Sequence, residues 1–244
     1  MKKTWQLLPA ALLLASAVAQ GSAQTFTSAE QPTNVLELYT SQGCSSCPPA
    51  EKWLSSLTQS PDLWKQVIPL AFHVDYWDYL GWKDPFANKS YSLRQRDYAR
   101  SGGTSSVYTP GFVVAGHEWR GWFQNQPLRL PDKQQTVGKL QLTLNGRELN
   151  AAFAPEQTPP QGLTLYVARL GFGIDTKIAK GENAGKTIKH DFVVLSLQQV
   201  AGDGNHWQSR LPDDARGTRQ AVVAWLGVPG QPAPYQAVGG WIKP

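Results

Sequence analysis

The chain has 244 residues, a formal net charge of +5 and only two cysteines. Its basic residues are scattered and form no dense run, which argues against nucleic acid as a binding partner. Its length exceeds that of a typical single domain, so we expect two domains.

The N-terminus has the residue order of a secretory signal peptide. Two lysines follow Met1, residues 7–18 form a mainly apolar stretch, and small residues come next. Cleavage after Ala19 or after Ala23 fits this pattern, so we assign residues 1–23 to the peptide. The alternative is an uncleaved membrane anchor, although the apolar stretch is short for a bilayer. We therefore expect a periplasmic or secreted protein with no stable membrane anchor after cleavage.

The next part of the chain alternates between strand and helix patterns. Residues 34–39 have the composition of a buried strand, and residues 50–57 repeat apolar side chains at helical spacing. Residues 68–74 form a second apolar run of strand length, and residues 88–101 have the pattern of a second helix. This order predicts a parallel α/β domain, to which we assign residues 30–130.

Cys44 and Cys47 lie at the turn between the first strand and the first helix. The unpaired N–H groups and partial positive charge of a helix N-terminus favour a thiolate over a thiol. The spacing therefore indicates a redox-active dithiol. An inert local disulfide is the alternative, although a bridge that closes so short a loop constrains the unfolded chain little.

From residue 138 onward the sequence shows only strand patterns. Leucines alternate with polar residues over 140–144, and Asn145-Gly146 is a strong signal for a hairpin turn. Glycine- and proline-rich turns separate the later apolar runs. The pattern predicts an all-β, sandwich-like domain over residues 138–244.

Three segments together carry a family resemblance: YTSQGCSSCPPAEKWL (39–54), FHVDYWDYLGWKDPFA (72–87) and VYTPGFVVAG (107–116). They resemble a bacterial secreted thioredoxin-like family that is catalogued as a domain of unknown function. Residues 181–187 resemble the signature of that family's second domain. The resemblance implies an α/β thioredoxin-like domain followed by an all-β sandwich-like C-terminal domain, and it supplies no substrate.

The resemblance also implies roles for individual residues. Cys44 is expected to be the exposed attacking sulfur and Cys47 the partly buried resolving one. Pro110 is expected in the cis form facing the dithiol, with the Thr109 backbone free to pair with an extended substrate. Glu37 is expected near the position of the buried acid of thioredoxins, where it would take the proton from Cys47. The alternatives are a Lys or Arg partner for Glu37 and an ordinary turn role for Pro110.

An aromatic segment follows the second predicted strand and contains Tyr76, Trp77, Tyr79 and Trp82. In open α/β sheets, ligands bind at the carboxyl ends of the strands, where this segment begins. We expect Tyr76, Trp77 and Trp82 to form an apolar surface for a protein substrate. The alternative is that these side chains fill the seam between the two domains, since large aromatic residues are more often core than site.

These features predict an extracytoplasmic thiol-disulfide oxidoreductase-like protein that acts on protein thiols or disulfides in the cell envelope. Ser45 and Ser46 bring no cation to the thiolate, so we favour a reductase or isomerase over an oxidase. We expect no cofactor and no metal. Two alternatives remain: a copper or zinc carrier through the two cysteines, and an envelope binding module with an auxiliary dithiol.

Overall fold

The computed structural model describes residues 22–132, 135–214 and 216–243. All but the last two residues of the predicted signal peptide lie outside these ranges, so the peptide stays a prediction. Within the described ranges, no helix is long and apolar enough to cross a membrane.

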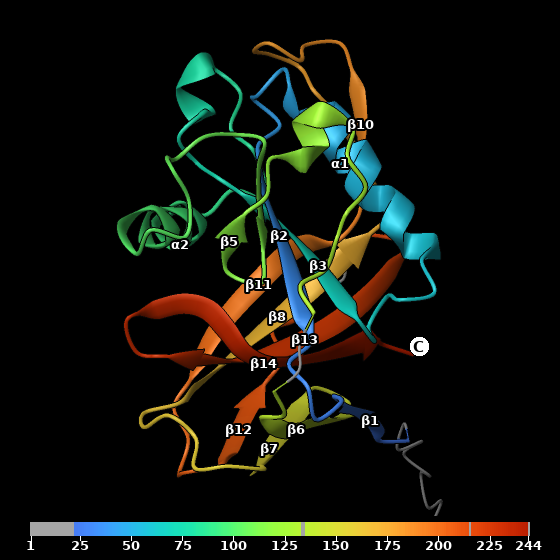
Figure 1. Cartoon of the computed structure of the whole chain (residues 1–244). Coiled ribbons are helices and arrows are strands. Elements are labelled where there is room, and N and C mark those ends of the chain that lie inside the picture. Colours follow the sequence, from blue (N-terminus) through green and yellow to red (C-terminus); the bar gives the residue numbers. More distant parts are fainter. Residues whose placement is uncertain (1–21, 133–134, 215, 244) are drawn as a thin grey trace, which may run out of the picture.

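A sheet of eight strands forms the centre of the molecule, in the order β14-β13-β8-β11-β3-β2-β4-β5 (Figure 1). In chain order, its strands are β2 (Asn34–Thr40), β3 (Val67–His73), β4 (Gly111–Val114), β5 (His117–Glu118), β8 (Thr164–Phe172), β11 (Val193–Val200), β13 (Arg219–Val228) and β14 (Gln231–Trp241).

Two smaller sheets and two α-helices complete the fold. The first small sheet has the order β1-β6-β7-β12, and the second pairs β10 with β9. Their strands are β1 (Gln24–Thr27), β6 (Gly138–Asn145), β7 (Glu148–Pro155), β9 (Ile174–Lys177), β10 (Thr187–His190) and β12 (His206–Arg210). The helices are α1 (Cys47–Ser56) and α2 (Lys89–Arg100), and short 3-10 turns span Leu57–Gln59, Asp78–Leu80 and Gly121–Gln124.

The predicted fold class, an α/β thioredoxin-like domain followed by an all-β sandwich-like domain, is wrong. Strands predominate, and the eight-stranded sheet draws strands from both parts of the chain. β11 runs parallel to β3, with Val193 paired to Ala71, and the Ala71 N–H donates to the carbonyl oxygen of Phe192 at 2.9 Å. The architecture is a β-rich sandwich. The prediction failed because hydrophobic periodicity is a local signal and does not identify the strand that will pair along a sheet edge.

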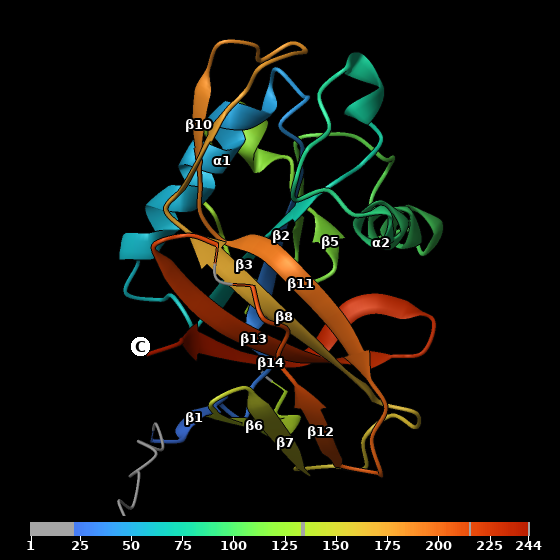
Figure 2. The ribbon, with the colours of Figure 1, turned by 180° about the vertical axis from the view of Figure 1, so that it is seen from behind.

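The four-stranded sheet packs on one face of the large sheet and forms the sandwich (Figures 1 and 2). Alternate residues of β6 are buried, because successive side chains of a strand point to opposite faces. Leu140 and Leu142 of β6 belong to the same buried cluster as Leu165 of β8, Val222 of β13 and Val238 of β14. The predicted hairpin at Asn145-Gly146 is confirmed by the antiparallel pairing of β6 with β7.

Both helices pack beside β2 and β3, at the other end of the large sheet (Figure 2). The buried residues of α1 are Cys47, Ala50, Glu51 and Leu54. Their spacing puts them on one helical face, because residues three and four apart are neighbours on a helix. The carboxyl group of Glu51 is therefore carried into the interior on the same face as the second cysteine. The domain limits of 30–130 and 138–244 stay a prediction.

Candidate functional site

A disulfide joins Cys44 to Cys47 at the start of α1. The Cys47 N–H donates to the Cys44 carbonyl oxygen at 3.2 Å. Pro48 and Pro49 occupy the first turn of the helix, where a missing N–H costs little. The Ser46 hydroxyl lies 3.4 Å from the Cys44 sulfur, within hydrogen-bonding reach.

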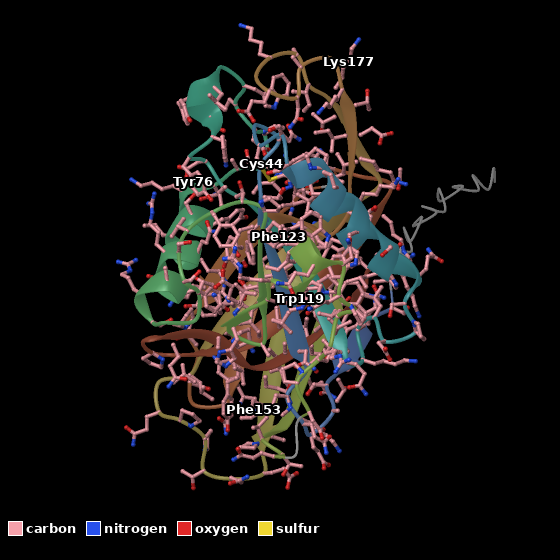
Figure 3. The ribbon with its side chains drawn as sticks, turned by 45° about the horizontal axis from the view of Figure 1, so that its top comes forward. Cys44, Tyr76, Trp119, Phe123, Phe153 and Lys177 are labelled. Carbon is pink, nitrogen blue, oxygen red and sulfur yellow. A yellow bond between two sulfur atoms is a disulfide. The ribbon has the colours of Figure 1, made fainter. Side chains whose placement is uncertain are left out.

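The expected exposure of Cys44 is wrong, because Cys44 is only 1% exposed and Cys47 is fully buried. The segment between β9 and β10 covers the cysteine turn. The Asn183 side-chain amide donates to the carbonyl oxygens of Gln42 and Cys44, both at 2.9 Å. Figure 3 shows Cys44 at the same end of the molecule as Lys177, the last residue of β9. This covering loop, residues 178–186, was not predicted, because its contacts span about 140 residues of sequence.

Two charged residues of the covering loop, Glu182 and Lys186, make hydrogen bonds that hold it in place. The Ser45 N–H donates to the Glu182 carboxylate at 3.1 Å, and the Lys186 ammonium donates to the Asn183 side-chain oxygen at 2.8 Å. Lys186 thereby fixes the orientation of the Asn183 amide, since a lysine only donates. The loop is held to the cysteine turn by hydrogen bonds, while Glu182 and Lys186 stay exposed.

Trp77, in the aromatic segment, contacts both the cysteine turn and Thr109. Its ring N–H donates to the Thr109 hydroxyl at 2.8 Å, and the Thr109–Pro110 peptide bond is cis. A Cβ placed on Gly43 would lie 3.0 Å from the Cβ of Trp77, so the backbone beside Cys44 packs directly on this side chain. The structure therefore brings Trp77, Thr109 and the cysteine turn together.

The other aromatic residues of the segment divide into inward and outward positions. The Trp82 ring N–H donates to the Gln42 side-chain oxygen at 2.9 Å. The Tyr76 hydroxyl donates to the Gln95 side-chain oxygen at 3.1 Å, and burial raises the pKa of Tyr76 to about 12. Tyr79 points outward and is 78% exposed. Only part of the aromatic segment thus faces the cysteine turn.

Glu37 lies in a buried ion pair. Arg94 of α2 donates to both carboxylate oxygens, at 2.8 and 2.7 Å. The hydroxyls of Tyr39 and Tyr98 donate to the same carboxylate at 2.7 and 2.6 Å. Burial, reinforced by the Glu37 charge, raises the pKa of Tyr98 well above its ordinary value. This geometry matches the alternative of an arginine partner, and the predicted proton transfer by Glu37 stays a prediction.

A polar network that the sequence did not predict lies on the inner side of α1. Glu51 accepts a hydrogen bond from the Thr40 hydroxyl at 2.7 Å and contacts His190 of β10 directly. His73, at the end of β3, pairs with Asp84 at 2.7 Å. The sequence does contain one sign of this network: Glu51, an acid, lies four residues after Cys47 on the apolar face of a predicted helix.

Burial and ion pairing shift the pKa values of His73 and Asp84 in opposite directions. Burial acts to raise the pKa of Asp84, but the charge and hydrogen bond of His73 outweigh it and hold that pKa below its ordinary value. Conversely, burial acts to lower the pKa of His73, and Asp84 raises it above the ordinary value. His73 and Asp84 are therefore a coupled, fully buried pair.

Comparison with known proteins gives a family and a fold. Residues 35–227 match the family described as "Protein of unknown function (DUF1223)". The chain belongs to this family. The match confirms the resemblance to a domain of unknown function and gives no information on secretion or redox activity. No curated protein matches the chain.

Two solved structures are similar to this member of DUF1223. Protein AGR_C_4864 from Agrobacterium tumefaciens is 27% identical, with a TM-score of 0.57 over 88% of this chain and 96% of that one. HBP35 of Porphyromonas gingivalis is 13% identical, with a TM-score of 0.54 over 87% of this chain and 76% of that one. The second likeness is one of fold alone.

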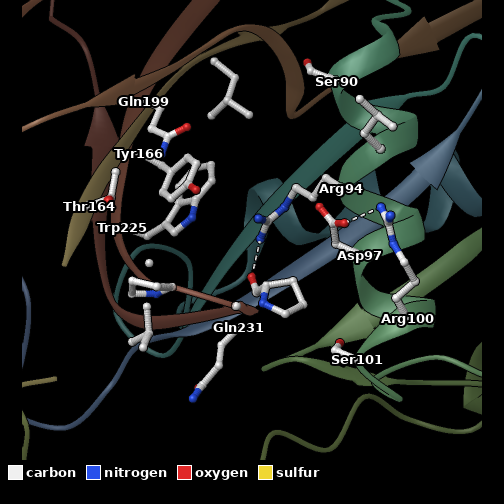
Figure 4. Close-up of a pocket in the computed structure, with 17 residues that line it drawn as sticks. Ser90, Arg94, Asp97, Arg100, Ser101, Thr164, Tyr166, Gln199, Trp225 and Gln231 are labelled. Atoms are coloured by element: carbon white, nitrogen blue, oxygen red, sulfur yellow. Dashed lines mark hydrogen bonds and ion pairs between the residues drawn. The ribbon is translucent and has the colours of Figure 1, made fainter. Parts of the chain in front are cut away.

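A cavity of about 760 Å³ lies between α2 and the strands β8, β13 and β14 of this DUF1223 protein (Figure 4). Arg94 reaches its wall and donates to the Pro232 carbonyl oxygen at 3.0 Å. Tyr166 and Trp225 also line the cavity and stack with ring centroids 5.4 Å apart, and the Arg94 guanidinium lies over the Trp225 ring. None of the residues that line the cavity belongs to the cysteine turn, and the Arg94 charge is already paired with Glu37. The cavity is therefore separate from the disulfide.

Proposed function

We propose that this protein is an extracytoplasmic thiol–disulfide exchange protein that acts on protein thiols or disulfides in the cell envelope. One observation carries the proposal: the two cysteines of the chain are joined to each other at the N-terminus of a helix. This position favours a thiolate when the pair is reduced. The extracytoplasmic location rests on the leader-like residues at the N-terminus and on the persistence of disulfides outside the cytoplasm.

The exchange passes through a mixed disulfide. A substrate thiolate attacks the Cys44 sulfur, a bond forms between the two sulfurs, and the Cys44–Cys47 bond breaks to release the Cys47 thiolate. A second substrate thiol, once deprotonated, attacks the substrate sulfur of the mixed disulfide and releases Cys44. Two electrons then reside on the protein dithiol and the substrate carries a disulfide. The reverse sequence reduces a substrate disulfide, and we favour this direction or isomerisation.

The Ser46 hydroxyl supports Cys44 as the attacking sulfur. It lies close enough to donate to the sulfur, and a hydrogen bond to a thiolate stabilises the charged form. Such a neutral donor lowers the thiol pKa less than a cation does, which is the reason for favouring a reductase or isomerase over a strong oxidant.

Exchange requires that the covering loop move, because a buried sulfur is out of reach of a protein substrate. Three hydrogen bonds hold the loop to the cysteine turn, and surface segments of this kind open at lower free energy than the core. When the loop opens, Trp77, Trp82 and Thr109 are the groups beside the cysteine turn that a substrate would meet. We assign them to substrate binding, together with Tyr76.

The test is the equilibrium of the cysteine pair in purified protein against a series of glutathione buffers. We expect a reversible two-electron couple with a potential above about −250 mV. The Cys44→Ser variant should lose turnover with a dithiol substrate. A potential below about −300 mV, or sulfurs that never exchange, would identify an inert structural disulfide and overturn the proposal.

A further inference from the structure

Three buried side chains with metal-ligating atoms converge on the inner side of α1. They are Glu51 of α1, His73 at the end of β3 and His190 at the end of β10, and one ligating atom of each lies within 4.8 Å of the others. All three residues are buried, with exposed fractions of 4%, 0% and 0%. We propose that these three residues bind a divalent transition metal, and that zinc is the ion they fit best.

An unpartnered nitrogen supports the site independently. The Nδ1 atom of His73 is paired with Asp84, whereas its Nε2 atom is buried and has no hydrogen-bond partner among the described residues. A buried polar atom without a partner costs free energy. A metal ion bound at Nε2 would remove that cost and would place His73 beside Glu51 and His190 in one coordination sphere.

Each proposed ligand is held by a second polar group. The Asp84 carboxylate lies 2.7 Å from Nδ1 of His73, the Thr40 hydroxyl donates to Glu51 at 2.7 Å, and the Gln42 amide lies 3.0 Å from Nε2 of His190. Metal-ligating histidines almost always have such a partner on the other ring nitrogen, which fixes the ring and its tautomer.

The hydrogen bonds define which ring nitrogen of His190 is the donor before metal binds. The Trp82 ring only donates, so the Gln42 oxygen faces Trp82 and the Gln42 nitrogen faces His190. Nε2 of His190 therefore accepts, and its Nδ1 carries the proton that points at Glu51. A metal at Nδ1 displaces this proton. Nε2 then becomes the donor, so the Gln42 amide must turn over and Trp82 loses its acceptor.

The ligand set selects the class of metal. Two imidazoles and one carboxylate suit zinc, whose three-ligand sites of this kind keep a fourth position open. Calcium and magnesium prefer oxygen ligands alone. Tetrahedral zinc with bonds of about 2.1 Å needs ligand atoms roughly 3.4 Å apart, so the direct contact between Glu51 and His190 has to widen slightly when the metal binds. The sequence had led us to expect no metal. The three proposed ligands lie far apart in the chain, so their spacing forms no recognisable metal-binding motif.

The site contains no sulfur, so it does not depend on the proposed thiol–disulfide exchange. It joins β10, which follows the covering loop, to α1, which begins at Cys47. Bound metal would therefore hold the covering loop more firmly over the disulfide. A protein whose disulfide proved inert could still bind zinc, and the reverse also holds.

The test uses the full chain with its disulfide oxidised, which offers no thiolate to a metal. Protein freed of metal with a chelator is mixed with zinc sulfate; one portion is desalted for elemental mass spectrometry, and the other is melted with the zinc still present. We expect one zinc per chain and a melting temperature raised by roughly 5–10 °C at a hundredfold excess over the dissociation constant. The Glu51→Gln and His73→Gln variants should lose both effects, whereas the exposed-site controls His117→Gln and His206→Gln should keep them. Asp84→Asn should weaken binding about 10–100-fold.

A second measurement needs no buried variant, in case the ligand variants do not fold. Cobalt(II) added to the wild-type protein should give ligand-field absorption without a thiolate charge-transfer band. Zinc should also change the tryptophan fluorescence of the wild type and not that of Trp82→Phe. An adventitious surface ion would leave melting and fluorescence unchanged, and a thiolate band would assign the metal to the cysteines. Either result, or retention of zinc by folded Glu51→Gln, overturns the proposal.

Discussion

The side-chain amide of Asn183 donates to the carbonyl oxygen of Cys44 at 2.9 Å, across 139 residues of sequence. The same amide also donates to the Gln42 carbonyl oxygen. A residue of the C-terminal half thus covers the disulfide of the N-terminal half. The site therefore belongs to both halves of the chain, and these hydrogen bonds help to keep it closed.

The first prediction concerns this cover. Replacing Asn183 with Ala removes two hydrogen bonds to the cysteine turn, each worth about 1 kcal/mol. Opening of the covering loop should become easier by about 2 kcal/mol, and reduction of the disulfide by dithiothreitol should accelerate roughly thirtyfold. The rate is followed by alkylation and mass spectrometry. Asn150→Ala, at an exposed position of β7, is the matched control and should react like the wild type. An unchanged rate in Asn183→Ala would mean that the loop does not limit access.

The second prediction separates the two cysteines. If Cys44 attacks and Cys47 resolves, Cys47→Ser should trap a mixed disulfide between Cys44 and its substrate, because the resolving thiol is missing. Cys44→Ser should trap none. Non-reducing electrophoresis of envelope extracts, followed by mass spectrometry of the shifted bands, distinguishes the two variants. Traps formed equally by both would show that the sulfurs are interchangeable.

The third prediction concerns the ion pair between Glu37 and Arg94. Replacing Arg94 with Met leaves a buried carboxylate without its cation, which should destabilise the fold by about 3–5 kcal/mol. Urea unfolding measures this loss. Arg100→Met, which removes an exposed ion pair at the end of the same helix, should change the free energy of unfolding by about 0–1 kcal/mol.

The fourth prediction decides the role of Glu37. Because Arg94, Tyr39 and Tyr98 all donate to its carboxylate, we expect Glu37→Gln to lower stability and to leave the pH profile of disulfide exchange unchanged. A profile in which the acidic limb is lost would instead establish Glu37 as the proton acceptor for Cys47. The exchange rate is measured from pH 5 to pH 9 on variant protein that is shown to be folded.

The fifth prediction tests the contact between Gly43 and Trp77. A methyl group at position 43 would lie 3.0 Å from the Trp77 Cβ, so Gly43→Ala should destabilise the protein by about 1–3 kcal/mol through overpacking. Thermal melting measures the loss. Ser45→Ala, at an exposed position two residues later, should leave the melting temperature close to that of the wild type.

Much of the local structure could be predicted from the sequence. The predicted strands 34–39 and 68–74 correspond to Asn34–Thr40 and Val67–His73, and the predicted helix 88–101 corresponds to Lys89–Arg100. These elements have strong internal periodicity. The pairing of β11 with β3 could not be predicted in the same way, because the residue pattern of a strand does not show which other strand it will pair with.

The candidate site was predictable only in part for a similar reason. The spacing of the cysteines identified the disulfide pair, and that information lies within four residues. Asn183 and His190 reach the inner side of the cysteine turn from a hairpin nearly 140 residues away. A single sequence does not show that these residues lie close to the cysteine turn. The role of Glu51 is recognised only once its buried partners are known.

The pairing of β3 with β11 within one sheet has a consequence for protein production. A fragment that ended near residue 130 would leave one side of β3 without a partner, although all seven of its residues are buried in the full chain. Unpaired, apolar strand edges recruit other chains and aggregate. The complementary fragment would expose β11 in the same way. Neither fragment is a sound basis for crystallisation, antibody production or interaction screens, and recombinant work on this family calls for the intact chain.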